Sequence, residues 1–166
     1  FGMLASVAVK RSLEHIGLID ICFKWPNDIY CHNKKISGVI QEHYINKYEK
    51  KTLITGVGIN FLSSPINLNY PTTHIIEHVK NISREQYFEI FINYFLNYFN
   101  NFLLNKSFEF VFEYKKTQML LNTNIKIKLD ENKIIDGKFI GINDDGSLVL
   151  IKDNKELSVY SGQIQV

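Results

Sequence analysis

The chain contains little cysteine: only Cys22 and Cys31 occur among its 166 residues. No stretch that resembles a secretory signal precedes them. We therefore interpret them as reduced thiols of a cytoplasmic protein, because stable disulfides belong mainly to oxidising compartments. A disulfide between the two is the alternative. Two isolated cysteines make no zinc pattern, and the 5 histidines show no ligand spacing, so that His74 and His78 are read as surface residues.

The chain also lacks an excess of either charge. It has 19 Lys and Arg against 17 Asp and Glu, a net charge of +2, which excludes a strongly basic nucleic-acid-binding surface and predicts no such partner. No apolar run reaches the ~18 residues that a membrane span needs, so no membrane partner is expected. With 45% hydrophobic residues, the chain suits one globular domain with a small appendage. Its partner must therefore be sought in local motifs.

Helical periodicity is present in three segments. Apolar residues over 1–16 recur on one side with Lys10 on the other, which predicts an amphipathic helix packed on the core. Ser83 begins a capping-box pattern for a long helix that extends to about residue 104. Phenylalanine, tyrosine and leucine nearly encircle this helix, so we expect it to be buried on more than one side. Residues 108–120 predict a shorter helix.

Four segments read as strands of an antiparallel or mixed sheet, and with the helices they predict an α+β fold. They are residues 19–25, 29–31, 35–45 and 52–61. Residues 32–34 look like a hairpin turn, the polar residues 46–51 are expected to form an exposed loop, and 63–73 is irregular.

After Asn122 the pattern changes to short alternating strands. These are residues 125–129, 133–142 and 147–151, with a strong hairpin signal at 144–146. Short strands at this density predict a small β-barrel. We place the domain boundary so that residues 1–121 form the first domain and 122–166 the second.

The first motif ends a predicted strand with Lys24. A lysine in a buried strand needs an anion, because an unpaired buried charge is strongly destabilising. Asp28 or Glu42 is one candidate for this anion. The phosphate or carboxylate of a ligand is the other, since lysine acts as a compact point charge toward such groups.

Two further motifs place glycine inside strands. Lys35 is followed closely by Gly38, and a glycine within a strand usually marks a bulge or a close approach to the backbone. Gly56 and Gly58 alternate with apolar residues, so one face of their strand is bare. A flat ligand group could lie there, or the glycines could simply make room for a packed helix.

Taken together, the segments KWPND (24–28), KISGV (35–39) and GVGIN (56–60) resemble, in this order, three segments of the catalytic core of biotin protein ligases. The preceding helix and the terminal barrel also look like that family's layout, so the resemblance covers nearly the whole chain. It implies a mixed sheet flanked by helices, of the class shared with lipoate ligases and class II aminoacyl-tRNA synthetases. An SH3-like β-barrel is expected to follow this sheet.

The resemblance implies an ATP-dependent ligase that acts in two steps. Biotin and ATP, with Mg²⁺, form biotinyl-5'-AMP and pyrophosphate. The biotinyl group then passes to a lysine of a biotin carboxyl carrier protein, which is the implied protein partner. We therefore expect the activity of a biotin–[biotin carboxyl-carrier protein] ligase.

The resemblance also implies roles for residues of the first motif. Lys24 is the expected catalytic residue, in contact with the biotin carboxylate and the α-phosphate, because a fixed cation offsets the repulsion between these anions. Asn27 and Asp28 would shape the adjoining loop, and Asp28 is also a candidate indirect Mg²⁺ ligand. Trp25 is expected in the core or in the pocket wall.

The other two motifs would serve the nucleotide side. Lys35 would supply a second positive group, and Gly38 would clear space for the ligand. Gly58 would permit a close approach of the adenine, while the Asn60 amide could read the edge of the base.

The family's glycine- and arginine-rich loop, GRGRxGRxW in pattern, is absent from this sequence. Its arginines provide much of the phosphate contact, so we expect the chain alone to be inactive or impaired. We also expect it to associate with a missing N-terminal segment or with itself. Two alternatives stay open: a lipoate or octanoate ligase of the same fold, against which the KWPND and GVGIN pair argues, and a non-catalytic interaction remnant.

Overall fold

The computed structural model describes residues 1–45 and 51–165, so the loop expected at 46–51 lies almost wholly outside the described residues. Four strands form the first sheet: β1 (Ile21–Lys24), β2 (Asp28–Cys31), β3 (Lys34–Ile45) and β4 (Lys51–Ile59). They pair in that order, and every pair is antiparallel. Two isolated parallel bridges, Phe23 with Gln118 and Lys35 with Thr72, join the sheet to later segments.

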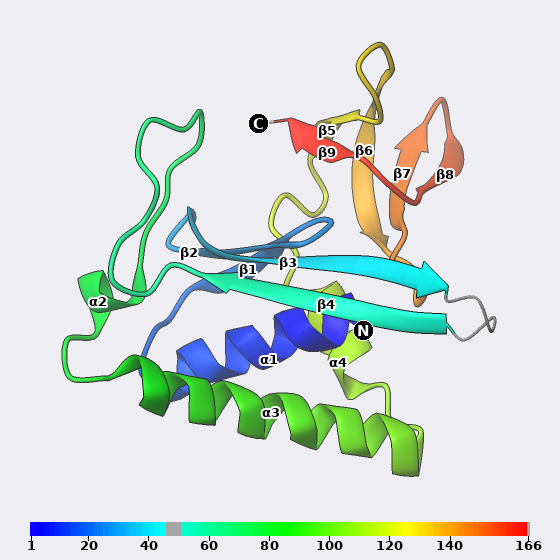
Figure 1. The fold of residues 1–166 in the computed structure, drawn as a ribbon. Coiled ribbons are helices and arrows are strands. Elements are labelled where there is room, and N and C mark those ends of the chain that lie inside the picture. The colour runs from blue at the N-terminus through cyan, green and yellow to red at the C-terminus, as the bar shows by residue number, and fades with distance from the viewer. Residues whose placement is uncertain (46–50, 166) are drawn as a thin grey trace.

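Helices cover one face of this sheet (Figure 1). They are α1 (Gly2–His15), α2 (Ile75–His78), α3 (Arg84–Asn105) and α4 (Glu109–Lys116). Helix α1 lies against the sheet, and α3 packs on α1 from outside. The short helix α2 falls in a stretch for which the sequence predicted no element.

Helix α1 is more deeply buried than an amphipathic surface helix. Lys10, expected on its outer side, is only 7% exposed. Its ammonium forms ion pairs with Glu14 and, at 3.1 Å, with Glu113 of α4. The expectation for Lys10 was therefore wrong, because α3 and α4 enclose the side of α1 that the sheet leaves free.

Helix α3 begins at the residue that the sequence predicted, but its burial differs from the prediction. Ser83 Oγ accepts a hydrogen bond from Gln86 N at 3.2 Å, which completes the capping box. Tyr87 is buried, whereas Phe88 is 59% exposed and Leu96 46% exposed. Burial on more than one side was thus a wrong prediction: within the described residues, the helix packs on the body of the molecule by one face only.

The second sheet contains the five remaining strands. They are β5 (Asn124–Lys128), β6 (Ile134–Ile142), β7 (Leu148–Lys152), β8 (Lys155–Val159) and β9 (Gln163–Gln165), paired antiparallel in the order β8-β7-β6-β5-β9. Ile127, Phe139 and Leu150 are fully buried between them. The fold is α+β, and its strand-rich C-terminal part agrees with the expected SH3-like barrel.

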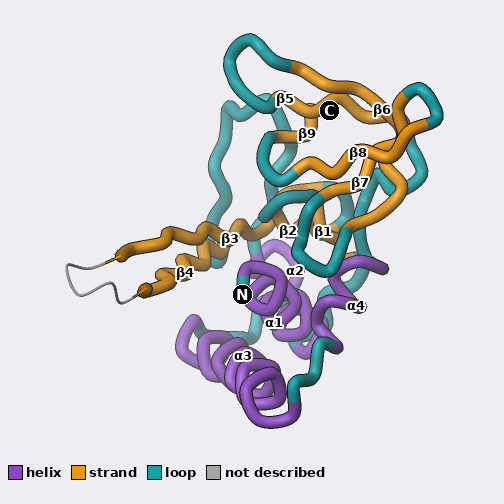
Figure 2. The backbone as a smooth tube through the Cα atoms, turned by 90° about the vertical axis from the view of Figure 1, so that its right-hand side faces the viewer, coloured by secondary structure: helices purple, strands orange, loops and turns teal. Residues whose placement is uncertain are grey.

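The helices and the second sheet lie on opposite sides of the first sheet (Figure 2). The indole Nε1 of Trp25 donates a hydrogen bond to the carbonyl oxygen of Gly146, at 2.9 Å. Lys115 at the end of α4 pairs with Asp144 at 2.8 Å. The predicted turn at 144–146 therefore contacts both Trp25, the residue after β1, and α4.

Both cysteines are free thiols. Cys31 lies opposite Ile21 in the ladder, while Cys22 lies opposite Tyr30. Because neighbouring residues of a strand point to opposite faces, the two thiols lie on opposite faces of the sheet. The alternative of a disulfide is therefore wrong. In the described part of the chain, no helix has the length and apolarity that crossing a membrane requires.

Candidate active site

The strand register brings the three motifs onto the face of the first sheet that the helices leave open. Lys24 lies opposite Asp28, Asp28 opposite Gly38, and Gly38 opposite Gly58. Residues that are opposite each other in a ladder point to the same face. One row across the sheet therefore carries a lysine, an aspartate and two glycines.

Lys35 belongs to the same face. It lies opposite Tyr30, which is two residues beyond Asp28 on β2. Residues two apart on a strand share a face. Lys24 and Lys35 thus project on the same side of the sheet, from the two strands that flank β2.

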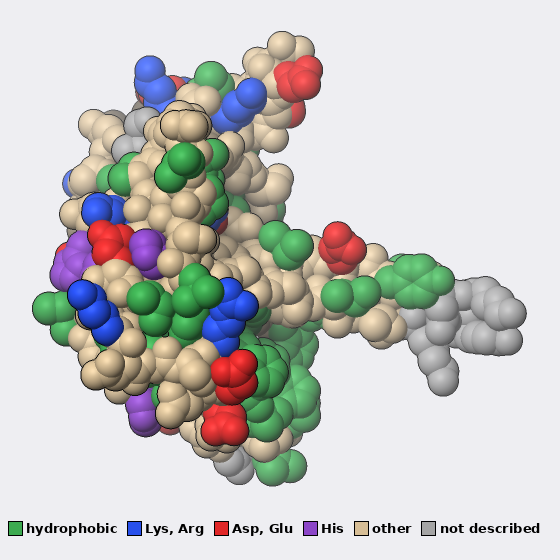
Figure 3. Space-filling view, turned by 60° about the vertical axis from the view of Figure 1, so that its left-hand side comes forward, with side chains coloured by type: hydrophobic (Ala, Val, Ile, Leu, Met, Phe, Trp, Pro, Cys, Tyr) green, Lys and Arg blue, Asp and Glu red, His purple; other side chains and the backbone are tan. Residues whose placement is uncertain are grey.

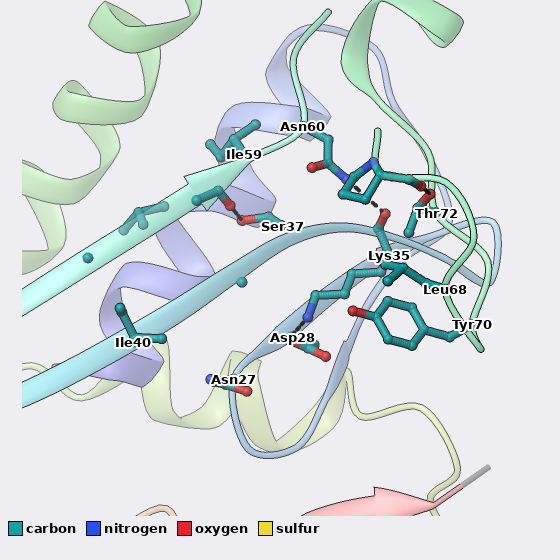
Figure 4. A pocket seen from close by; sticks show the side chains of 15 residues that line it. Asn27, Asp28, Lys35, Ser37, Ile40, Ile59, Asn60, Leu68, Tyr70 and Thr72 are labelled. Atoms are coloured by element: carbon teal, nitrogen blue, oxygen red, sulfur yellow. Dashed lines mark hydrogen bonds and ion pairs between the residues drawn. The ribbon is translucent and has the colours of Figure 1, made fainter. Parts of the chain in front are cut away.

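An open pocket of about 670 Å³ lies beside these residues (Figure 4). Its lining residues are Asn27, Asp28, Lys35, Ser37, Gly38, Ile40, Gly56, Val57, Gly58, Ile59, Asn60, Pro65, Leu68, Tyr70 and Thr72. Six of the eight predicted site residues are in this set; Lys24 and Trp25 are not. Sequence reasoning missed the loop residues Tyr70 and Thr72, because an irregular stretch carries no periodic signal.

Lys35 is held in place by two interactions within the pocket. Its ammonium lies 2.5 Å from Oδ1 of Asp28 and 5.4 Å from the centre of the Tyr70 ring. A Cβ placed on Gly38 would lie 3.3 Å from the same Asp28 oxygen. Gly38 therefore makes room for this ion pair.

Lys24 is 9% exposed, and within the described residues its side chain forms no ion pair or hydrogen bond. Its ammonium lies 5.8 Å from the centre of the Tyr30 ring. Burial lowers the pKa of Lys24, with an opposing contribution from Asp28 and a further lowering by Lys35. Neither protein anion considered from the sequence, Asp28 or Glu42, forms an ion pair with it.

The floor of the pocket is largely backbone at the glycines. The nearest atom to a Cβ on Gly58 would be the carbonyl oxygen of Gly38, at 3.8 Å. Asn60 closes the end of β4: its Nδ2 donates to the carbonyl oxygens of Lys35, at 3.3 Å, and Thr73, at 3.0 Å. The amide hydrogens of Asn60 thus hold the loop in place.

Trp25 lies outside the pocket that gathers the other residues. Its side chain is 3% exposed, and it borders a second cavity of about 490 Å³ toward the second sheet. Asn27 and Ile40 line both cavities, so the two adjoin. The structure therefore gives Trp25 a core position with one edge on a cavity.

Two protein-family models match the chain. The biotin/lipoate A/B protein ligase family matches residues 2–60, and the biotin protein ligase C terminal domain matches residues 120–166. Among curated proteins, the bifunctional ligase/repressor BirA of Bacillus subtilis is 24% identical over 169 residues. The match covers 99% of this chain and 52% of the relative, so the chain spans about half the length of that protein.

Solved structures give the same result. Biotin protein ligase from Aquifex aeolicus superimposes with a TM-score of 0.82 and 27% identity, over 99% of this chain and 72% of that one. The same enzyme in complex with biotin and ATP gives a TM-score of 0.80 and 26% identity, over 99% and 69%. By its two matched segments and its fold, the chain belongs to the biotin protein ligase family.

Proposed function

We propose that the chain forms the part of a biotin protein ligase that holds ATP and biotin. This ligase would activate biotin as biotinyl-5'-AMP and transfer the biotinyl group to a lysine of a biotin carboxyl carrier protein. The observation that carries the proposal is the position of Lys24 and Lys35 on one face of the sheet, beside a pocket floored by Gly38 and Gly58. The Aquifex aeolicus relative, whose structure contains biotin and ATP, supports it.

The chemistry needs cations at this place. A carboxylate attacks a phosphate, and both are anions, so a fixed positive group stabilises their approach and the charge of the transition state. Lys35 is already neutralised by Asp28, whereas Lys24 has no counter-ion among the described residues. We therefore assign to Lys24 the contact with the carboxylate and the α-phosphate, and to Lys35 the nucleotide side.

The residues that line the pocket offer Mg²⁺ few ligands of the kind it prefers. Among the described residues, Asp28 is the single carboxylate that lines the pocket, and Lys35 offsets its charge. Magnesium commonly keeps several waters and binds one or two carboxylates together with substrate phosphates. Asp28 would hold such an ion through water, and ATP with its magnesium would supply the activated phosphate.

We propose that the chain divides into domains 1–121 and 122–166. Helix α4 ends at Lys116, and the second sheet begins at Asn124. The matched C-terminal domain starts at residue 120. These positions support a boundary near residue 121. The free thiols of Cys22 and Cys31 are consistent with the cytoplasmic location that we propose.

The isolated 166-residue chain is proposed to form the adenylate slowly or not at all. In the part of the chain that the structure describes, no arginine lines the pocket. Arg11 is bound to Glu113 at 2.8 Å, and Arg84 lies at the start of α3. Stabilisation of the phosphates would therefore rest on lysine alone, unless a further segment supplies the glycine- and arginine-rich loop.

Calorimetry with the 166-residue chain tests the proposal. The probes are a non-hydrolysable sulfamoyl analogue of biotinyl-5'-AMP and the matched lipoyl compound. We expect 1:1 binding of the biotinyl compound, at least about tenfold tighter than the lipoyl compound, which is ~1.4 kcal/mol. Preference for the lipoyl compound would indicate a lipoate ligase, and absence of heat with both would indicate a non-catalytic remnant.

A further inference from the structure

Three side chains that bind metals meet where the turn after β2 contacts α2. They are Cys31, His32 and His78, and one ligand atom from each lies within 4.8 Å of the other two. Cys31 is fully buried at the end of β2, while the two histidines are exposed. None of the three belongs to the proposed ligase pocket. The fold alone brings this group together, since α2 lies far from the turn in the sequence.

The spacing is close to that of a metal site. In tetrahedral zinc sites with bonds of about 2.0–2.3 Å, the ligand atoms lie roughly 3.3–3.8 Å apart. The rings of His32 and His78 are already 5.7 Å apart between centres and inclined by 38°. Movements of about an ångström would therefore bring the three ligand atoms onto one ion, and the exposed histidines have room to make them.

The hydrogen bond at His78 indicates which nitrogen is free. Thr73 Oγ1 lies 2.6 Å from Oε2 of Glu77 and 2.7 Å from Nε2 of His78. A carboxylate can only accept, so the single hydroxyl proton goes to Glu77, and Nε2 must donate to the hydroxyl. Nδ1 of the neutral His78 ring then carries a lone pair, and Nδ1 makes no hydrogen bond within the described residues.

His32 has a comparable arrangement. Its Nδ1 lies 3.4 Å from Oδ2 of Asp20, which favours a proton on that nitrogen and a lone pair on Nε2. Metal-bound histidines usually donate their other ring nitrogen to a carboxylate or another oxygen, which fixes the ring. Asp20 and Thr73 are therefore the oxygen partners that such ligands require.

We propose that Cys31, His32 and His78 form a zinc site, with water in the fourth position. One thiolate and two imidazoles suit the borderline-soft Zn²⁺ ion. Zinc binding would displace the thiol proton of Cys31. Zinc would link α2 to the turn after β2. The loop before α2 carries Thr72, which lines the pocket. The site does not depend on the ligase function.

The test uses the tag-free, metal-depleted 166-residue chain. Zinc is titrated against a chromophoric chelator, and cobalt(II) is added to a second sample for absorption spectroscopy. We expect one zinc per chain, and with cobalt a near-ultraviolet thiolate charge-transfer band. His32→Asn and His78→Asn should each weaken zinc binding by about tenfold or more, and Cys31→Ser should abolish the band.

Cys22→Ser and His43→Asn are the matched controls, because each removes the same chemical group outside the cluster. Both should bind zinc as the parent does. Lack of stoichiometric binding by the parent would overturn the site, as would loss of the cobalt band in Cys22→Ser. Cys31 is buried and its variant could unfold, so the exposed histidines provide the second criterion: unchanged zinc affinity in both histidine variants would also overturn the proposal.

Discussion

Lys35 Nζ lies 2.5 Å from Oδ1 of Asp28, between the adjacent strands β3 and β2 (Figure 4). Asp28, the residue opposite Lys24 in the ladder, is therefore already paired with Lys35. The two lysines of the proposed site therefore differ in charge pairing. Lys35 forms an ion pair, whereas Lys24 has no counter-ion among the described residues. A ligand anion would complete the environment of Lys24.

Lys24→Ala should weaken ligand binding while leaving the stability of the fold nearly unchanged. The side chain loses no ion pair or hydrogen bond, so we expect the free energy of unfolding to change by no more than about 1 kcal/mol. Affinity for the biotinyl-adenylate analogue should fall about 100-fold, or ~2.7 kcal/mol, because the cation that we propose to contact the acyl phosphate is gone. Thermal unfolding and calorimetry measure the two quantities. A large loss of stability with normal affinity would mean that Lys24 is structural.

The stability of the chain should depend on pH through Lys24. Burial holds its folded-state pKa below the ordinary 10.5, so between these two values the unfolded chain binds more protons and stability rises with pH. The charged form thus destabilises the fold at neutral pH, and this effect vanishes above about pH 10.5.

Lys24→Met removes that charge and keeps the length of the side chain. We expect this variant to be more stable than the parent at neutral pH, with the difference shrinking as the pH rises. Urea unfolding of both proteins across this range measures it. Because all other titrating groups are common to the two proteins, a difference that stays constant or grows would contradict the expectation.

Gly58→Ala tests the floor of the pocket. The added methyl would meet only the Gly38 carbonyl oxygen at 3.8 Å, which is ordinary contact, so stability should change by less than about 1 kcal/mol. Affinity for the adenylate analogue should fall about tenfold or more, because the methyl would stand where we propose that the ligand lies. Gly141→Ala is the control, since its Cβ would meet nothing within 4 Å. Equal affinities of both variants would remove Gly58 from the site.

The projecting arm of β3 and β4 should make the isolated chain associate. Figure 3 shows hydrophobic side chains along it, among which Ile40 is 61% exposed, Tyr44 60% and Ile54 55%. Exposed apolar edge strands recruit further strands. Size-exclusion chromatography with light scattering should report species larger than a monomer.

Ile54→Lys should shift this equilibrium toward the monomer, because a charge on an edge strand opposes pairing. Ile66→Lys changes an even more exposed isoleucine, 81%, outside the arm, and should leave the equilibrium unchanged. A parent chain that stays monomeric at every concentration would refute the expectation of association.

Some features of this protein follow from short stretches of sequence. The capping box at Ser83 needs only residues three apart, and the turn at Gly146 needs only a positive φ of 87°. The three motifs were also recognisable locally, and the alternation of strand residues correctly places Lys24, Asp28 and Gly38 together once the strands pair. Such features depend on backbone preferences over a few residues.

Other features were decided by packing between distant segments. Lys10 is buried because α4 places Glu113 next to it. Helix α3 keeps an exposed apolar face because, among the described residues, it packs against α1 on one side only. The partner of Asp28 could not be read from the sequence, since two lysines were within reach, and the register of β2 with β3 made the choice. Cys31 meets His78 only after α2 folds against the turn. Sequence thus determined most of the elements and the chemical groups that they carry, while the tertiary structure determined which groups meet, because desolvation and charge pairing depend on neighbours that are remote along the chain.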